Sequence, residues 1–471
     1  MGFIVRSRYK QNYEEEQASL FHAAKEVKND TNNITTLKID GHIVEDEAII
    51  EQRISSFFRS LFNGFHISNL VDTGSSFVPD YSNFEEFVEH IGQMSDEESR
   101  DMLRGIEIDE LEGIVKECKF NKSPGLDGLS YEFYKVVWPV ISNVFKDILQ
   151  CQLDKKMIVD SNRRGATRLL PKVKGVPQSD ELRPITLLNS DYKILSKLLV
   201  KRIKPVMKKV ICSSQLCTVE GRNILFGVNN LLSSVSFVNK QRRMACLFSL
   251  DFFKAYDRVL ISYLLKVMKK MRFSDTFCEW IKMMHNGAKT CFILRNLTDD
   301  IQLSFSIRQG DPLAMILYVI YIEPLLLHLE RKLRGIDLFG FSQILESFCY
   351  DVNVVTEHLD DLVKADKIIS KFEAMSGAIL SRNKKCKILG LGAWSHRQEW
   401  PLHYVQSENE IKVFGIFIKN NYQSMIKRNW DFRQVYAFPC IKSCRSKAIC
   451  FIQSLLCRIH TTNHKNNCKE I

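Results

Sequence analysis

Two aspartates in this chain stand where a protein could hold metal ions for phosphoryl transfer. Asp251 directly follows the apolar run MACLFSL (244–250), which predicts a buried strand. Asp351 lies far along the chain, in FCYDVNVV (348–355), where a second strand is predicted to begin. Carboxylates at the ends of opposed strands can hold two magnesium ions for phosphoryl transfer. The pattern therefore favours that chemistry.

Basic side chains in another segment suit the phosphates of a nucleotide. Lys172 and Arg183 flank a predicted turn between two strands, in ATRLLPKVKG (166–175) and LRPITLL (182–188). An arginine binds two phosphate oxygens at once, and a lysine adds a point charge. Either residue alone is typical of a solvated surface, so the prediction depends on the pair.

Two further loops carry candidate ligand contacts. Gln309 and Gly310 precede an apolar helix whose first turn suits Pro312. The glycine lets backbone approach a ligand, and the glutamine can bond a base or sugar edge. Lys384 and Lys385 follow a Ser-Gly turn and could neutralise pyrophosphate or act as a general acid. Composition is equally consistent with a plain basic loop there.

Hydrophobic spacing predicts the elements around these residues. VLISYLLKVMKKM (259–271) is apolar at helical intervals, and LKIDGHIV (37–44) predicts a hairpin turning at Asp40 and Gly41. Further predicted elements are a helix over 12–27, a helix ending at Phe62, a helix from near Asp109 with Glu112 as capping partner, and a hairpin in EIKVFGIFI (410–418).

Composition favours a polyanionic partner and no membrane. Lys and Arg exceed Asp and Glu by 66 − 55 = 11, although an ordinary basic surface would show the same excess. The N-terminus has no signal-peptide core, and the apolar run LAMILYVIYI (313–322) is too short to span a bilayer and meets Glu323 and Pro324. We expect a cytoplasmic or nuclear protein.

The 14 cysteines are irregularly spaced through apolar segments, which is typical of reduced core residues. Cys440, Cys444, His460 and His464 have a spacing that zinc can use. The segment 434–471 is dense in cysteine generally, which favours an incidental pattern, and we do not expect a zinc site.

Five motifs in a fixed order carry a specific resemblance. They are NKSPGLDG (121–128), LRPITLLNSDYKILSK (182–197), QLCTVEGR (215–222), LDFFKAYDRV (250–259) and RQGDPL (308–313). Together they resemble the polymerase module of non-long-terminal-repeat (LINE-type) retrotransposon reverse transcriptases, from near the N-terminus to about Arg433. The resemblance implies an RNA-directed DNA polymerase that uses an RNA template, a DNA primer and deoxynucleoside triphosphates. It gives no oligomeric state.

The resemblance assigns roles to the candidate residues. Asp251, Asp351 and the Phe252 carbonyl match the ligands of two Mg²⁺ ions, for which Mn²⁺ could substitute. Tyr256 matches the steric gate, the aromatic ring that blocks a ribose 2′-hydroxyl. The remaining matches are Lys172 and Arg183 on the triphosphate, Gln309 and Gly310 beneath the nucleotide and template, and Lys384 or Lys385 near the leaving pyrophosphate.

At position 350 the chain departs from the family. An aspartate pair is expected at 350 and 351, but the first position is Tyr350. The pair Asp360 and Asp361 is not a substitute, because the apolar spacing after it marks a helix start. A tyrosine hydroxyl is neutral at pH 7 and cannot replace the missing charge. We predict severely impaired polymerisation with nucleic-acid binding retained; the alternative is a non-catalytic nucleic-acid-binding remnant.

The predicted architecture is α+β, with the right-hand shape of a polymerase: fingers, a palm of antiparallel strands backed by helices, and a partial thumb. The endonuclease domain that precedes the family's polymerase is absent from this sequence. The expected divisions are a linker-like extension (1–112), fingers and the start of the palm (113–240), palm (241–395), palm end and start of the thumb (396–433), and a divergent tail that suggests a frameshift or a false exon (434–471).

Overall fold

The computed structural model describes residues 34–63 and 77–436. Two sheets organise this part of the chain, one of five strands in the order β10-β11-β5-β12-β13 and one of four in the order β4-β3-β6-β7. The strands of the first are β5 (Met244–Leu250), β10 (Leu345–Phe348), β11 (Asp351–Thr356), β12 (Lys387–Gly392) and β13 (Gln406–Ser407). Those of the second are β3 (Arg164–Pro171), β4 (Leu182–Leu187), β6 (Lys289–Ile293) and β7 (Ile301–Gln302).

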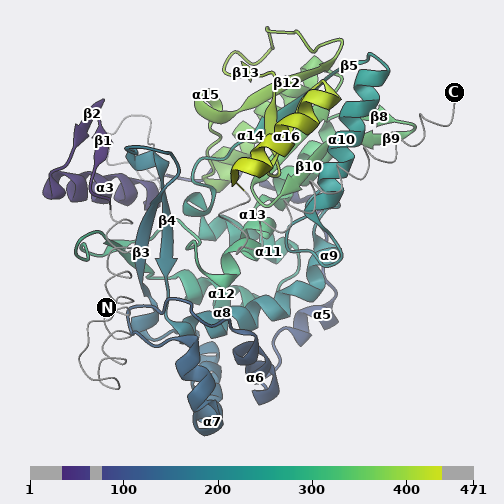
Figure 1. Ribbon diagram of the computed structural model, residues 1–471. Coiled ribbons are helices and arrows are strands. Elements are labelled where there is room, and N and C mark those ends of the chain that lie inside the picture. Colours follow the sequence, from purple (N-terminus) through teal and green to yellow (C-terminus); the bar gives the residue numbers. More distant parts are fainter. Residues whose placement is uncertain (1–33, 64–76, 437–471) are drawn as a thin grey trace.

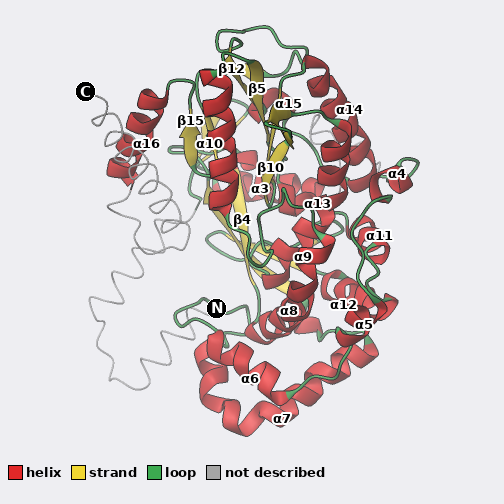
Figure 2. Ribbon diagram, turned by 90° about the vertical axis from the view of Figure 1, so that its right-hand side faces the viewer, coloured by secondary structure: helices red, strands yellow, loops and turns green. Residues whose placement is uncertain are grey.

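Helices cover both faces of the five-stranded sheet (Figures 1 and 2). α10 (Ile224–Lys240) packs on one face, where Ala245 and Leu247 of β5 join its apolar side. Cys246, Phe248 and Leu250 point to the other face and belong to the main core. That face is covered by α11 (Ile261–Lys270), α13 (Pro312–Lys332) and α14 (Leu359–Ser376). Burial on both sides explains why β5 is a continuous apolar run.

Pairing in the five-stranded sheet is antiparallel except at its edge. β10, β11, β5 and β12 follow one another antiparallel, as predicted for the strands around the aspartates. The edge strand β13 pairs parallel to β12. The sheet is therefore mixed rather than purely antiparallel.

The four-stranded sheet packs against an N-terminal unit. The hairpin predicted at 37–44 is confirmed as β1 (Leu37–Ile39) and β2 (His42–Val44), with positive φ at Asp40 and Gly41. The predicted helix is confirmed as α3 (Glu47–Phe62), whose buried side packs on β3, β6 and β7 through Phe58 and Phe292.

Helices form the end of the molecule opposite the five-stranded sheet, at the bottom of Figure 1. They are α5 (Asp96–Asp101), α6 (Ile108–Glu117), α7 (Tyr131–Lys155), α8 (Ser190–Ile203), α9 (Met207–Val210) and α12 (Asp275–His285). The predicted helix near Asp109 is confirmed as α6, but its capping partner is wrong. Glu107 is the N-cap residue without a side-chain bond, and Glu112 instead pairs with Lys116 one turn later.

The apolar helix α13 is longer than the sequence suggested. It continues through Glu323 and Pro324 to Lys332, and in the described residues it is the one helix long and apolar enough to span a bilayer. Its most apolar window is 83% buried inside the protein, however. α13 is thus placed as a central core helix that passes beneath the pocket described below.

The remaining elements are short or peripheral. They are α4 (Phe84–Val88), α15 (Arg382–Lys385), α16 (Tyr422–Tyr436), the hairpin β8 (Ile336–Leu338) and β9 (Phe341–Gln343), and the predicted hairpin around Gly415, confirmed as β14 (Ile411–Val413) and β15 (Ile416–Ile418). The predicted helix at 12–27 and the residues Cys440, Cys444, His460 and His464 lie outside the described residues.

Candidate active site

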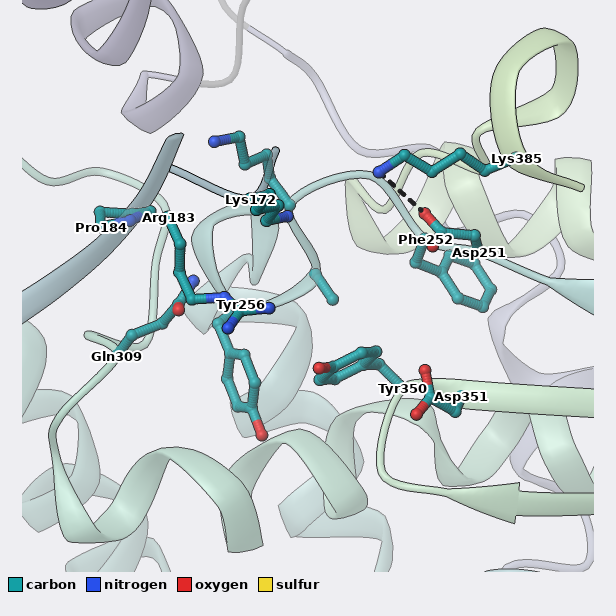
Figure 3. A pocket seen from close by; sticks show the side chains of 12 residues that line it. Lys172, Arg183, Pro184, Asp251, Phe252, Tyr256, Gln309, Tyr350, Asp351 and Lys385 are labelled. Carbon is teal, nitrogen blue, oxygen red and sulfur yellow. Dashed lines mark ion pairs between the residues drawn. The ribbon is translucent and has the colours of Figure 1, made fainter. Parts of the chain in front are cut away.

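A pocket of about 300 Å³ opens where the two sheets approach each other (Figure 3). It collects side chains from the β3–β4 turn, the end of β5, the β10–β11 turn, the loop before α13, and α15. Its lining residues are Lys172, Arg183, Pro184, Asp251, Phe252, Lys254, Ala255, Tyr256, Gln309, Tyr350, Asp351 and Lys385. Residues predicted from five separate segments are thus brought together.

The two aspartates lie on neighbouring strands at one side of the pocket. Val352 of β11 pairs with Leu250 of β5, so the next step of this antiparallel register sets Asp351 opposite Asp251. Both side chains are half-buried. Asp251 Oδ1 accepts a hydrogen bond from Ser381 Oγ at 3.1 Å and lies 3.8 Å from Lys385 Nζ. The two carboxylates are open to the pocket, and the Lys385 ammonium lies beside one of them. Such a pair is suited to binding divalent metal ions.

Position 350 lies in the tight turn between β10 and β11. Cys349 before it has φ 61°, a left-handed conformation. The buried Gln215 holds that turn, because its Oε1 accepts from Cys349 N at 2.8 Å and its Nε2 donates to Cys349 O at 3.2 Å. The turn is fixed by contacts of residue 349, and the side chain of Tyr350 is carried into the pocket.

Among the described residues, Asp251 and Asp351 do not belong to a larger cluster of metal-binding side chains. In residues 34–63 and 77–436, no three His, Cys, Asp or Glu side chains gather as a metal-binding group. The alternative acidic pair is remote from the pocket: Asp361 is buried at the start of α14 and accepts hydrogen bonds from Arg334 N and Thr356 Oγ1. The prediction that Asp360 and Asp361 mark a helix start is confirmed.

Basic side chains line the pocket around the aspartates. Lys172 and Arg183 flank the β3–β4 turn as predicted, and Lys385 extends from α15 toward Asp251 (Figure 3). Burial, together with the positive charges of Lys385 and Arg183, lowers the pKa of Lys172. Cations that repel one another in a partly buried site favour a polyanionic ligand, because its charge relieves the repulsion.

Lys254 and Asp257 form a second, buried pair of ionisable residues at the pocket, for which the sequence predicted no role. Lys254 has φ 47°, its Nζ donates to the Leu182 carbonyl, and the ammonium lies 5.1 Å from the Phe58 ring centroid. Burial lowers its pKa to about 7, and burial raises the pKa of Asp257 to about 7. In the sequence, the only indication that these two residues belong to the site was their place in the motif LDFFKAYDRV.

The loop before α13 brings Gln309 into the pocket. Its Nε2 donates to Asp257 Oδ2 at 3.1 Å, which leaves its carbonyl oxygen as the end able to accept a hydrogen bond from a ligand. Gly310 does not line the pocket. At φ 119° it packs on β4, where an added Cβ would lie 2.3 Å from the Thr186 carbonyl oxygen. The close approach that requires this glycine is to the protein's own backbone.

Tyr256 lies in the 3₁₀ turn after β5 and faces Tyr350. Its hydroxyl contacts Cys349 Sγ at 3.0 Å, and its ring packs on Tyr318 of α13 at 5.2 Å between centroids. Lys385 of α15 lines the pocket as well, whereas the side chain of Lys384 lies outside the described part of the structure. Nine of the eleven predicted site residues therefore line one cavity, and Gly310 does not.

Comparison with known proteins identifies the family. Residues 170–418, which include every residue lining the pocket, match the family described as reverse transcriptase (RNA-dependent DNA polymerase). The chain belongs to the reverse transcriptase family. The match covers more than half of the sequence and contains the loops and strands that carry Asp251 and Asp351.

Curated relatives place this reverse transcriptase among the non-LTR, LINE-type elements. A 149 kDa protein of transposon TX1 from Xenopus laevis is 32% identical over 82% of this chain. Pol polyproteins of the retrotransposable elements R2 from Popillia japonica and R1 from Bradysia coprophila are 23% and 32% identical over 48% and 22% of it. The aligned parts cover 29%, 31% and 11% of these relatives, so the reverse transcriptase described here corresponds to less than a third of each.

Proposed function

We propose that this chain is the polymerase module of an RNA-directed DNA polymerase of a LINE-type retrotransposon, in which polymerisation is severely impaired. In this proposal the five-stranded sheet is the palm, and the β3–β4 sheet with α6–α8 forms the fingers. The partners are an RNA template, a DNA primer and deoxynucleoside triphosphates. The observation that carries the proposal is the opposition of Asp251 and Asp351 in one pocket with Tyr350 at the position of the missing carboxylate.

The residues present fit a divalent cation only in part. The pocket offers oxygen ligands from Asp251, Asp351 and the Phe252 backbone, the ligand type that Mg²⁺ prefers. The 3.8 Å contact of Lys385 with Asp251 shows that this corner attracts positive charge. Two ions close together need bridging carboxylates, however, and one has been lost. Bound metal would lower the barrier by neutralising charge on the reacting phosphate.

The chain's own residues would bind and orient the nucleotide. Lys172, Arg183 and Lys385 would hold the phosphates, and Tyr256 would contact the sugar. The Gln309 amide is fixed by Asp257 and would face the base or sugar edge. The phosphate contacts do not depend on position 350, so we expect binding of the phosphates and of the template to persist.

The expected defect follows from transition-state arithmetic. A thousandfold loss of rate corresponds to about 4 kcal/mol, and one ligand to the catalytic metals plausibly supplies that much. Such a defect leaves the alternative function open: a nucleic-acid-binding protein that retains the polymerase shape without its chemistry. Tyr350 is the observation that favours this alternative. With either function we propose a cytoplasmic or nuclear protein.

Primer extension on an RNA template tests the proposal. The unmodified protein is compared with Tyr350→Asp, and binding of the primer-template is measured for both. We expect extension only by the variant. Extension by the unmodified protein would show that the tyrosine is tolerated. Binding without extension by either protein would favour the non-catalytic function.

A further inference from the structure

The Tyr350 side chain is large as well as uncharged, and its ring enters the pocket. The ring packs edge-on against Tyr256, with centroids 5.7 Å apart and planes at 81°. It also packs edge-on against Tyr318, at 6.3 Å and 88°. Figure 3 shows the Tyr350 ring extending from the β10–β11 turn toward Tyr256, with its hydroxyl at the Tyr256 end. The three tyrosines form one cluster at the floor of the pocket.

The backbone holds this ring in place. Gln215 fixes Cys349 by two hydrogen bonds, and the Cys349 thiol contacts the Tyr256 hydroxyl. Tyr318, the third ring of the cluster, is fully buried on α13. A shift of the Tyr350 main chain would break the contacts of Cys349. Edge-on packing of aromatic rings adds a favourable interaction that also opposes rotation of the side chain.

The ring occupies the side of the pocket that faces the steric gate. Lys172 and Lys385 line the pocket away from these rings, toward the top of Figure 3, and leave space for phosphates. With Tyr350 in place the pocket measures about 300 Å³. This is at the lower end of the range of about 300–1,000 Å³ for small-molecule sites. A nucleotide sugar resting on Tyr256 would meet the edge of the Tyr350 ring.

We propose that the Tyr350 ring fills the sugar side of the pocket and weakens the binding of nucleoside triphosphates, separately from the loss of the carboxylate. The proposal rests on the function proposed above and adds a second defect to it. A missing charge slows the reaction of a bound nucleotide, whereas an occluding ring keeps the nucleotide out. Inorganic pyrophosphate, which has no sugar, should bind regardless of the residue at 350.

Three substitutions separate ring from charge. Tyr350→Ala removes the ring without supplying a carboxylate, Tyr350→Asp removes the ring and supplies one, and Tyr350→Phe keeps the ring and removes the hydroxyl. Each protein is bound to an RNA template whose primer ends in a dideoxynucleotide, so that no bond can form. The dissociation constant of the next deoxynucleoside triphosphate is then measured with Mg²⁺, alongside that of inorganic pyrophosphate.

We expect Tyr350→Ala to bind the nucleotide about tenfold more tightly than the unmodified protein, as relief of overpacking would give. Tyr350→Phe should bind as weakly as the unmodified protein, because its ring remains. Pyrophosphate affinity should be equal in the unmodified protein, Tyr350→Ala and Tyr350→Phe, which also verifies their folding. With an ordinary primer, Tyr350→Ala should still fail to extend.

Two results would overturn the proposal. Equal nucleotide affinity in Tyr350→Ala and the unmodified protein would show that the ring swings aside when a nucleotide enters. Equal gains for pyrophosphate and nucleotide in Tyr350→Ala would show an effect on the whole site rather than on its sugar side. A different result would contradict the function proposed above. If Tyr350→Ala binds nucleotide more tightly but Tyr350→Asp does not extend a primer, the ring does obstruct the nucleotide, but the proposed polymerase function is wrong.

Discussion

The basic and the acidic residues of the pocket differ in how completely they match the family resemblance. On the cation side, Lys172, Arg183 and Lys385 are all present and converge on one space. On the carboxylate side, Asp251 and Asp351 lie on neighbouring strands, and the Tyr350 ring beside Asp351 points toward Tyr256. One side is suited to phosphates, whereas the other carries a tyrosine where the family resemblance implies a carboxylate.

The difference shows that the turn's backbone does not depend on the residue it presents. The β10–β11 pairing is regular up to Phe348 opposite Asp351. Gln215 and the left-handed Cys349 hold the turn through main-chain contacts. A substitution at 350 can therefore abolish function while the surrounding fold is retained. Catalytic side chains commonly have this freedom, because they are positioned by a scaffold that they do not stabilise.

The largest effect should come from Asp251, one of the two carboxylates in the pocket. In the Tyr350→Asp background, Asp251→Asn should lower primer extension about a thousandfold, because a neutral amide cannot neutralise metal ions. Primer-template affinity should be unchanged, since it depends on the basic surface. Steady-state extension and equilibrium binding measure the two effects. A comparable loss in both would mean that Asp251 supports the fold instead of the chemistry.

Substitution of a basic residue in the pocket should change the KM for the nucleotide more than the rate. In the same background, Lys172→Ala should raise the KM for the deoxynucleoside triphosphate up to about a hundredfold, the loss of one charge-assisted contact. The rate at saturating nucleotide should fall much less. Lys174→Ala is the matched control, a lysine two residues along that does not line the pocket. Equal effects of the two substitutions would argue that general positive charge suffices.

The sequence predicted those parts of the site that depend on local pattern. The strand β5, the helix α11 and the loop before α13 each follow from spacing or turn residues within one segment. The brace from Gln215 to Cys349 could not be predicted, because it joins residues 134 apart. The burial of Lys254 and Asp257 was equally hidden, since both are normally surface types. The close approach of Gly310 to the Thr186 carbonyl likewise depends on a tertiary neighbour.

The scaffold shared by both sides should show its own pH dependence. Glu323 of α13 is fully buried and accepts from Cys212 N at 2.7 Å, and burial raises its pKa to about 8. The folded state therefore holds a proton that the unfolded state releases near its ordinary pKa of about 4.5. This contribution to stability is complete below about pH 4.5 and is lost as pH rises toward and through 8.

Chemical denaturation at pH 6 and pH 8 measures this effect. The free energy of unfolding should fall by about 2 kcal/mol more in the unmodified protein than in Glu323→Gln, which keeps an acceptor but cannot ionise. Parallel loss of nucleotide and template binding would show that α13 supports both sides of the pocket. Identical pH profiles for the two proteins would mean that Glu323 does not titrate in this range.

The smallest effect should come from Asp360, which with Asp361 resembles the expected aspartate pair in sequence but lies at the start of α14. Asp360 is largely exposed at the start of α14, where it pairs with Arg334 and with Lys364 at 3.3 Å. Exposed ion pairs contribute little to stability, so Asp360→Asn should leave the melting temperature and the extension rate of the Tyr350→Asp protein unchanged.

Asp361→Asn is the contrasting variant, because the buried Asp361 carboxylate accepts hydrogen bonds from two backbone N–H groups and from Thr356. It should lower the melting temperature without altering the KM for nucleotide. If Asp360→Asn abolished extension, the metal ligands would have to be sought at α14 rather than at the β10–β11 turn.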